Sequence, residues 1–199
     1  LWENEYPQLI RVTTAQERYG LPRAGLDTDC AFEVGEVGCS IFFFTIQDFF
    51  THPEGSRSAL ILPEVFWSGT MHGSETIGVT VVMESAALLL EAASCESKPR
   101  VITSESWSKE VLEAMRCRDQ LRKKGIDDQR RRWLARLVST RRIVVVPAPN
   151  SLGFYRNEMT EGAHDPEEDF PSINYDETYC METIAARTVN EIFREHMFQ

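Results

Sequence analysis

Short runs of apolar residues divide the chain and predict four β-strands. They cover residues 9–13, 40–46, 60–67 and 142–147. The runs are rich in β-branched and aromatic residues, which favour an extended backbone. The last run, RIVVVP, is almost continuously apolar, as in a strand that is buried on both faces. The chain is therefore expected to contain a largely buried sheet.

Between these runs, apolar residues recur at helical spacing. Helices are predicted over residues 76–93, 106–124, 133–138 and 177–198, each with an apolar stripe along one side. Strands that alternate with helices indicate an α/β layer fold. No internal repeat or linker interrupts this pattern, so residues 1–199 are expected to form a single domain.

Acidic residues outnumber basic ones. The sequence holds 31 Asp and Glu against 21 Lys and Arg, for a formal net charge of −10. Proteins that bind nucleic acid usually carry the opposite balance, so no nucleic-acid partner is expected. Basic residues concentrate in residues 116–142, where eleven stand against three acidic ones. Three interpretations of this stretch stay open: a solvated helical surface, a site for an anionic partner, or the partner of an acidic segment in the same fold.

The sequence also allows expectations about a membrane-spanning helix and about an N-terminal leader. No apolar run approaches the roughly 18 residues of a membrane helix, because Glu64, Glu84 and Glu91 interrupt the most apolar stretches. No membrane span is therefore expected. The first residue is Leu1, and no charged-then-apolar leader is present, so a processed or trimmed chain is expected.

The five cysteines show no C-x-x-C spacing, which argues against a zinc ribbon. Cys30 and Cys39 flank one turn-rich stretch. They form either a short disulfide or two ordinary thiols, and the sequence leaves both interpretations open.

A candidate metal site follows the third apolar run. The chain leaves this strand through Gly69, and His72 and Glu75 stand where a helix is about to begin. A separation of three residues lets one turn direct both side chains at the same point. An imidazole and a carboxylate are suitable ligands for Zn²⁺, although an open catalytic site needs three protein ligands. The alternative is a capping histidine and a glutamate in the first helical turn, where the helix dipole favours negative charge.

Three ordered segments carry a resemblance to a known family. They are SGTMHGSETIG (68–78), VVVPAPNSLGFYRNE (144–158) and YPQLIRV (6–12). The first resembles the H-G-x-E segment of the zinc metallocarboxypeptidases (carboxypeptidase A-like). The second is similar to their strand followed by N-P-D-G-[YF], and the third to their N-terminal passage from helix to strand. The resemblance implies the N-terminal two-thirds of that domain, an α/β fold with a mixed central sheet and helices on both faces.

The resemblance also implies roles for individual residues. His72 and Glu75 would be two of the zinc ligands. Arg156 would polarise the scissile carbonyl and stabilise the oxyanion, with a surface arginine as the alternative. The third ligand and the general-base glutamate of the family would follow Gln199, so the C-terminal third of the domain and its catalytic base are expected outside this chain. His196 stands near the end of an amphipathic helix and is not expected to replace that ligand.

One segment departs from the family pattern. Where the family has D-x-N-R-[ND]-F, this chain has DPEEDF (165–170), with Glu167 and Glu168 in place of the Asn–Arg pair that receives the substrate's terminal carboxylate. An arginine offers a carboxylate a bidentate fork, whereas two glutamates repel it. If the glutamates face the pocket, a cationic or otherwise altered substrate end suits the site. If the loop lies outward, they are solvated.

The sequence thus predicts a zinc-dependent hydrolase that removes C-terminal residues from peptides or proteins, with atypical recognition of the substrate's end. A further protein segment would complete the domain. The alternative is a catalytically inactive, carboxypeptidase-like interaction module in a larger assembly. The Cys30–Cys39 pair and the resemblance favour a secreted or lysosome-like location.

Overall fold

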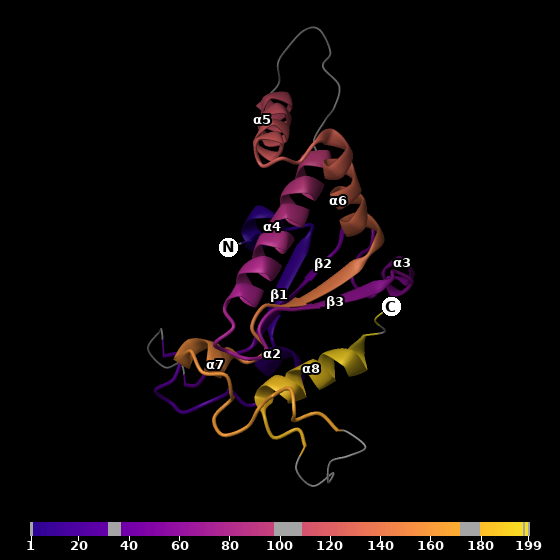
Figure 1. The fold of residues 1–199 in the computed structure, drawn as a ribbon. Helices are drawn as coiled ribbons and strands as arrows, with labels where there is room; N and C mark the ends of the chain where they lie inside the picture. The colour runs from indigo at the N-terminus through magenta and orange to yellow at the C-terminus, as the bar shows by residue number, and fades with distance from the viewer. Residues whose placement is uncertain (1, 32–36, 98–108, 172–179, 197, 199) are drawn as a thin grey trace. The chain divides into compact units, whose positions relative to one another are not determined.

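The computed structural model describes residues 2–31, 37–97, 109–171, 180–196 and 198. Four strands form one sheet in the order β1-β2-β4-β3 (Figure 1). The strands are β1 (Ile10–Thr14), β2 (Phe42–Ile46), β3 (Glu64–Ser68) and β4 (Arg142–Val146). The helices are α1 (Trp2–Glu5), α2 (Ala15–Tyr19), α3 (Arg57–Leu60), α4 (Ile77–Ser97), α5 (Lys109–Lys123), α6 (Asp128–Thr140), α7 (Ser151–Arg156) and α8 (Ile184–Glu195).

Backbone hydrogen bonds show that the sheet is mixed. Leu9 accepts from Gln47, and Ile41 accepts from Ala15, so β1 and β2 run antiparallel. Pro63 accepts from Arg142, and Val146 accepts from Gly69, so β3 and β4 run parallel. Parallel neighbours need a long crossover, which α4, α5 and α6 supply between β3 and β4.

The chain forms two compact units. The first comprises Leu1–Arg11, Ile46–Pro63 and Glu84–Ile143, and the second comprises Val12–Thr45, Glu64–Met83 and Val144–Gln199. A compact unit need not fold alone, so the single domain expected from the sequence stays a prediction.

The second unit has a core on one face of its strands. Phe43 of β2 and Val144 and Val146 of β4 belong to it, because side chains two apart along a strand point to the same face. Ala15 of α2 and Ile192 of α8 are fully buried in the same cluster. Two helices therefore cover this face.

The opposite face of the strands in the second unit carries the start of α4, up to Met83. Phe42 points away from Phe43 and lines a cavity together with Val79 and Met83 of α4. Helices thus lie on both faces of the sheet in this unit. The α/β fold with a mixed sheet and helices on both faces, which the sequence predicted, is confirmed.

The strand predicted over 60–67 begins later than expected. Leu60 ends α3, whose N-cap Ser56 accepts a hydrogen bond from the backbone of Ala59, and β3 begins only at Glu64. Pro63 separates the two elements, because a proline lacks the N–H that a strand interior needs. The helix predicted over 177–198 is shorter than expected at both ends, since α8 spans only Ile184–Glu195 and Thr183 is its N-cap. Residues 177–179 of the prediction lie outside the described residues.

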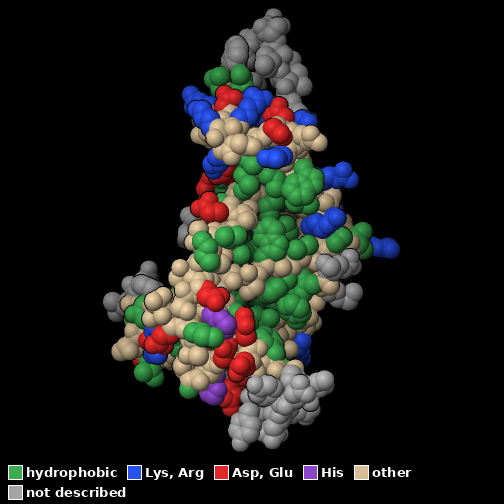
Figure 2. All heavy atoms as spheres, viewed as in Figure 1, with side chains coloured by type: hydrophobic (Ala, Val, Ile, Leu, Met, Phe, Trp, Pro, Cys, Tyr) green, Lys and Arg blue, Asp and Glu red, His purple; other side chains and the backbone are tan. Residues whose placement is uncertain are grey.

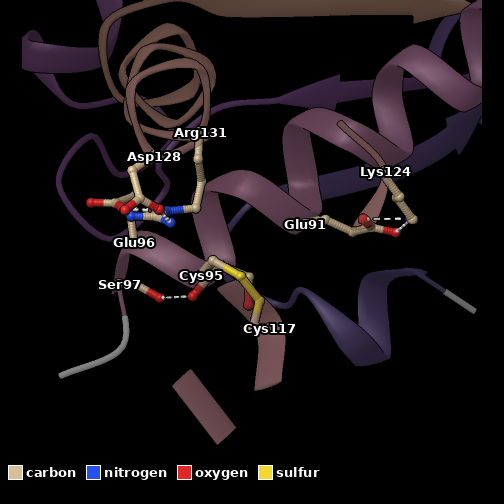
Figure 3. The surroundings of a disulfide bond; sticks show 9 residues. Glu91, Cys95, Glu96, Ser97, Cys117, Lys124, Asp128 and Arg131 are labelled. Atoms are coloured by element: carbon tan, nitrogen blue, oxygen red, sulfur yellow. Dashed lines mark hydrogen bonds and ion pairs between the residues drawn. A yellow bond between two sulfur atoms is a disulfide. The ribbon is translucent and has the colours of Figure 1, made fainter. Parts of the chain in front are cut away.

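In the first unit, a disulfide joins Cys95 of α4 to Cys117 of α5 (Figure 3). Cys95 is fully buried and Cys117 is half-buried, so most of the cross-link is shielded from solvent. The sequence analysis did not predict this pair. Its only pairing candidate, Cys30 and Cys39, also forms a disulfide, in the second unit.

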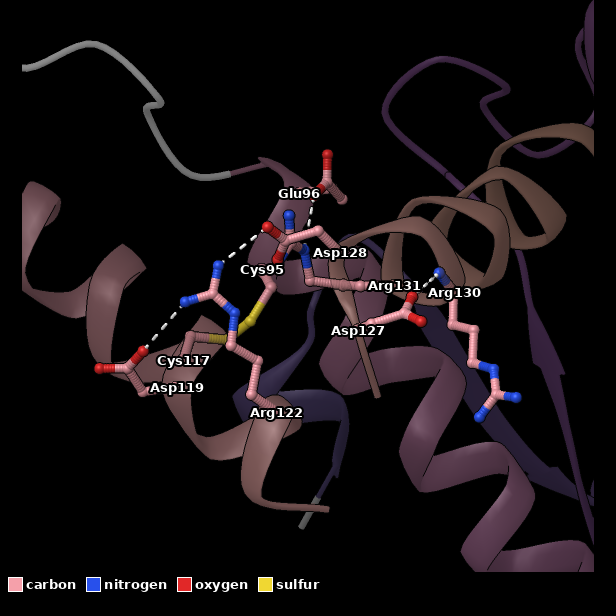
Figure 4. A network of polar contacts seen from close by, with 9 residues as sticks. All are labelled: Cys95, Glu96, Cys117, Asp119, Arg122, Asp127, Asp128, Arg130 and Arg131. Atoms are coloured by element: carbon pink, nitrogen blue, oxygen red, sulfur yellow. Dashed lines mark hydrogen bonds and ion pairs between the residues drawn. A yellow bond between two sulfur atoms is a disulfide. The ribbon is translucent and has the colours of Figure 1, made fainter. Parts of the chain in front are cut away.

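Part of the basic stretch 116–142 is paired within its own unit. Arg131 is almost completely buried, and it contacts Glu96 at 2.7 Å and Asp128 at 2.5 Å (Figure 4). Lys124 binds the carboxylate of Glu91 at 2.7 Å. These partners lie outside the acidic segment 157–186, so the three interpretations of the basic stretch stay open.

One helix in the described part of the chain, α4, is long and apolar enough to cross a membrane. It also carries Glu84 and Glu91, and its buried residues pack inside the protein. The absence of a membrane span, expected from the sequence, stays a prediction.

Candidate metal site

The turn after β3 is held against the end of β4 by close backbone packing. The N–H of Gly69 donates to Val146 at 3.0 Å, and a Cβ at Gly69 would lie 2.0 Å from the carbonyl oxygen of Pro147. A Cβ at Gly73 would lie 2.0 Å from the backbone of Gly153. Only glycine allows these approaches, so the turn and α7 lie directly against each other.

His72 lies between carboxylates at both ring nitrogens. Its Nδ1 is 3.5 Å from Oε1 of Glu75, and its Nε2 is 3.2 Å from Oδ1 of Asp165. The imidazole is only 14% exposed, whereas Glu75 is 68% exposed. Figure 2 shows histidine side chains bordered by acidic ones on the face that it draws.

This arrangement favours positive charge at or beside the imidazole. A carboxylate only accepts hydrogen bonds, so Nε2 carries the proton that is donated to Asp165. In a neutral ring, Nδ1 would then present a lone pair to the carboxylate of Glu75. A second proton on the ring, or a cation between Nδ1 and Glu75, removes this repulsion.

The pKa of His72 reflects the same surroundings. Burial of the imidazole lowers its pKa, but the hydrogen bond to Asp165 and the charges of Glu167 and Asp165 outweigh burial and raise it above its ordinary value. A proton and a metal ion compete for the same nitrogen, because a metal-bound histidine is deprotonated there.

Two of the donors that zinc needs are present. Ligand atoms about 2.0–2.1 Å from a tetrahedral zinc lie about 3.3 Å from each other, close to the 3.5 Å between Nδ1 of His72 and Oε1 of Glu75. Asp165 holds the other ring nitrogen, as carboxylates commonly do behind a metal-binding histidine. Within the described residues, no group of three or more His, Cys, Asp or Glu side chains could hold a metal ion. The residues present therefore fit a zinc site in part.

The two glutamates of the DPEEDF segment differ in position. Oε2 of Glu167 lies 3.7 Å from Nε2 of His72, although the side chain is 60% exposed. The backbone N–H of Glu167 also donates to Asp165. Glu168 is exposed, and its backbone N–H donates to the carbonyl of Asp165. One glutamate thus lies beside the candidate metal site, and the other lies at the surface.

Arg156, near the end of α7, is held by Asp29. Its Nε and Nη2 donate to the two carboxylate oxygens at 3.0 and 2.7 Å, in a bidentate pair. This hydrogen bond raises the pKa of Arg156. A role at a substrate carbonyl, implied by the resemblance, would require Arg156 to leave Asp29.

Replacing Asp29 by asparagine is expected to reduce the pH dependence of stability. The hydrogen bond from Arg156, followed by that from the backbone of Leu26, lowers the pKa of Asp29 below its ordinary value. A carboxyl group with a lowered folded-state pKa contributes stability above its unfolded pKa of about 4, and this contribution is lost as the pH falls through the folded pKa. Urea unfolding between about pH 2 and pH 7 measures the loss.

Asp27→Asn, which removes an exposed carboxylate two residues away, provides the control and should keep the wild-type dependence. Equal loss of stability on acidification in wild type and Asp29→Asn would contradict the prediction.

The other histidines of this unit contact other carboxylates. Nδ1 of His196 is 3.0 Å from the carboxylate of Glu64, which is the first residue of β3. His72 comes after the last residue of β3, at the other end of the strand. His164 is half exposed and contacts Glu182 at 2.9 Å. Neither contact joins these rings to His72.

The sequence analysis did not assign Asp165 or Asp29 a role. Asp165 lies 93 residues after His72, and Asp29 lies 127 residues before Arg156, so no local spacing marks either partner. Asp165 lies in the DPEEDF segment, but the sequence analysis considered roles there only for Glu167 and Glu168.

Comparisons with known proteins found similarity to solved structures alone. No protein-family model matches this sequence, and no curated protein matches it. Among solved structures, the chain is similar to the carboxypeptidase A from Helicoverpa armigera, with a TM-score of 0.47 and 13% sequence identity. The match covers 98% of this chain and 39% of that chain, so this chain spans about two-fifths of its length.

Proposed function

We propose that this chain is the zinc-binding part of a hydrolase of the carboxypeptidase type, with His72 and Glu75 as two of the metal ligands. The observation that carries the proposal is the position of His72, with Glu75 at one ring nitrogen and Asp165 at the other. A metal ion between His72 and Glu75 would remove the repulsion between lone pair and carboxylate.

Each residue has a distinct task in this proposal. His72 and Glu75 bind the metal, and Asp165 fixes the tautomer and orientation of the imidazole. Zinc, when bound, polarises a carbonyl and lowers the pKa of a bound water. The third ligand and the general base are assigned to a further protein segment that completes the domain.

The substrate in this proposal is a peptide or protein C-terminus. Glu167 supports a cationic or altered substrate end, because it places a second carboxylate beside His72. Arg156 can bind a carbonyl oxygen of the substrate only after it breaks its hydrogen bonds to Asp29. The Cys30–Cys39 and Cys95–Cys117 disulfides support an oxidising compartment, in line with a secreted or lysosome-like location.

Zinc titration of metal-free protein tests the site. A longer protein that includes the segment completing the domain is expected to bind one zinc ion per chain by calorimetry, and His72→Ala in that protein is expected to abolish this binding. Asp165→Asn should weaken it by about 10–100-fold, because the histidine loses its orienting partner. His164→Ala is the matched control, since its half-exposed ring contacts Glu182 instead, and it should bind zinc as wild type does.

Equal zinc binding by wild type and His72→Ala would contradict the proposal. Absence of zinc binding by the folded, completed protein would favour the second candidate, a catalytically inactive interaction module. The engagement of Arg156 by Asp29 favours that candidate, because this arginine is already neutralised within the fold.

A further inference from the structure

Helix α6 of the first unit carries an exposed tryptophan between two exposed arginines. The three residues are Arg130, Trp133 and Arg136, and we call them the α6 surface. Residues three apart on a helix are neighbours, so Arg130 lies one turn before Trp133 and Arg136 lies one turn after it. One face of the helix therefore presents two positive charges on either side of an indole ring.

The two arginines have no acidic partner within the described part of the chain, unlike their neighbour Arg131. Arg131 is buried and pairs with Glu96 and Asp128. Figure 4 shows the guanidinium of Arg130 pointing away from Asp127, whose carboxylate accepts from the backbone N–H of Arg130 instead. The positive charge of the α6 surface is thus available to a carboxylate from outside the chain.

Acidic side chains border the α6 surface on one side. Arg136 and Arg132 line a cavity of about 500 Å³ together with Glu5, Asp48 and Glu96. Glu96 is held by a buried arginine, and Asp48 accepts two backbone N–H bonds and one hydroxyl bond within its own turn. These carboxylates are therefore oriented by other donors, and none of them forms an ion pair with Arg136.

Trp133 exposes much of its indole ring to solvent. The side chain is 58% exposed, whereas Trp2 and Trp67, the other tryptophans that the structure describes, are half-buried. Covering apolar surface is favourable by about 25 cal/mol per Å². Tryptophan and arginine are also enriched among the few residues that supply most of the binding energy at protein interfaces. Their combination on one helix face indicates a docking surface.

The charge and size of the α6 surface favour a short acidic peptide over a longer polyanion. The whole chain has a formal net charge of −10, so a polyanion that extends beyond α6 meets repulsion. A short peptide is affected mainly by charges within about 8 Å, the screening length at physiological ionic strength. Surfaces for single-stranded nucleic acid stack successive bases on several aromatic rings, whereas this face carries one.

The spacing of the two arginines specifies the peptide further. Six residues separate Arg130 from Arg136, which corresponds to about 9 Å along the helix axis. An extended peptide places residues four apart on the same face at a distance of about 13 Å, and the residue midway between them also points to that face. Long arginine and glutamate side chains bridge the difference. A peptide of the pattern Glu-x-Phe-x-Glu therefore matches the α6 surface.

We propose that the α6 surface docks an acidic peptide segment of another protein. One carboxylate of the segment binds Arg130, a second binds Arg136, and an apolar side chain between them covers Trp133. This docking requires neither zinc nor the candidate metal site, and its test is carried out with a chelator present. Failure of either proposal therefore leaves the other untouched.

The probe is the peptide acetyl-Gly-Glu-Ser-Phe-Ser-Glu-Gly-amide, titrated into the chain and followed by NMR chemical shifts. We expect a dissociation constant of about 0.1 mM at low salt, with binding that weakens as salt is added. Trp133→Ala should weaken binding by roughly tenfold. The double variant Arg130→Gln/Arg136→Gln should weaken it by about tenfold, roughly threefold for each exposed ion pair, and should remove most of the salt dependence.

Arg194→Gln is the matched control, because it removes one positive charge from an exposed helical arginine in the second unit. It should bind the probe as wild type does, and a peptide with lysine in place of both glutamates should not bind to wild type. No binding of the acidic peptide, or equal weakening by Arg194→Gln and Trp133→Ala, would overturn the proposal.

Two further results would assign the α6 surface to another occupant. Tighter binding of a heparin fragment or a short oligothymidylate than of the peptide would overturn the assignment to a peptide. Self-association of wild type in sedimentation experiments, lost in Trp133→Ala, would show that a second copy of this chain covers Trp133 and would overturn the assignment to another protein.

Discussion

Replacing Asp169 by alanine is expected to lower the free energy of unfolding by about 3–5 kcal/mol. Asp169 is 5% exposed, and its carboxylate accepts from the N–H of Glu182 and from both the N–H and the hydroxyl of Thr183. Thr183 is the N-cap of α8, so these bonds fix the start of the helix that covers the core. Alanine would leave three donors without an acceptor, two of them on a residue that is itself buried.

Urea unfolding at neutral pH measures this effect. Asp169→Asn keeps one acceptor oxygen and should lose less stability than Asp169→Ala. Glu168→Ala, at the exposed neighbouring position, should change the free energy of unfolding by no more than about 0.5 kcal/mol. Equal effects of Glu168→Ala and Asp169→Ala would show that α8 does not depend on this carboxylate.

Removal of the Cys95–Cys117 disulfide is expected to lower the free energy of unfolding by about 3 kcal/mol. The two cysteines are 22 residues apart, and opening a loop of this length returns conformational entropy to the unfolded chain. The double variant Cys95→Ala/Cys117→Ala, unfolded in urea without reductant, measures the loss. Cys180→Ala is the control and should unfold close to wild type, because Cys180 takes no part in a disulfide.

Reductant added to wild type should lower its free energy of unfolding by more than the double substitution does, because reductant also opens Cys30–Cys39. A double variant as stable as wild type would mean that the cross-link contributes nothing to the free energy of unfolding.

The strands were predictable wherever the apolar pattern was unbroken. Residues 142–147 contain β4, as predicted. Ile143, Val144, Val145 and Val146 are all buried, so the strand is continuously apolar and was easy to recognise in the sequence. The strand over 60–67 was misplaced because Leu60 and Ile61 are apolar and yet exposed. Hydropathy alone does not distinguish an exposed apolar residue in a short helix from a buried one in a strand.

The short helices escaped prediction for a different reason. α7 has six residues, too few for a periodic stripe, and it forms because the side chain of Asn150 caps it. α2 carried a readable signal, since Thr14 and Glu17 form a capping box. At the candidate site, the spacing of His72 and Glu75 was local and therefore visible. The partner Asp165 is brought to His72 by the fold alone.

The two disulfides also bear on how the chain reaches its oxidised state. Cys30 pairs across 9 residues and Cys95 across 22, so each native partner is among the nearest cysteines along the chain. The entropic cost of closing a loop rises with its length, so these encounters are favoured over longer ones while the chain is still unfolded. The chain has five cysteines, so other pairings compete, and local encounter favours the native ones. Oxidative folding should therefore produce the correct cross-links early, with little need for later exchange through the remaining thiol of Cys180.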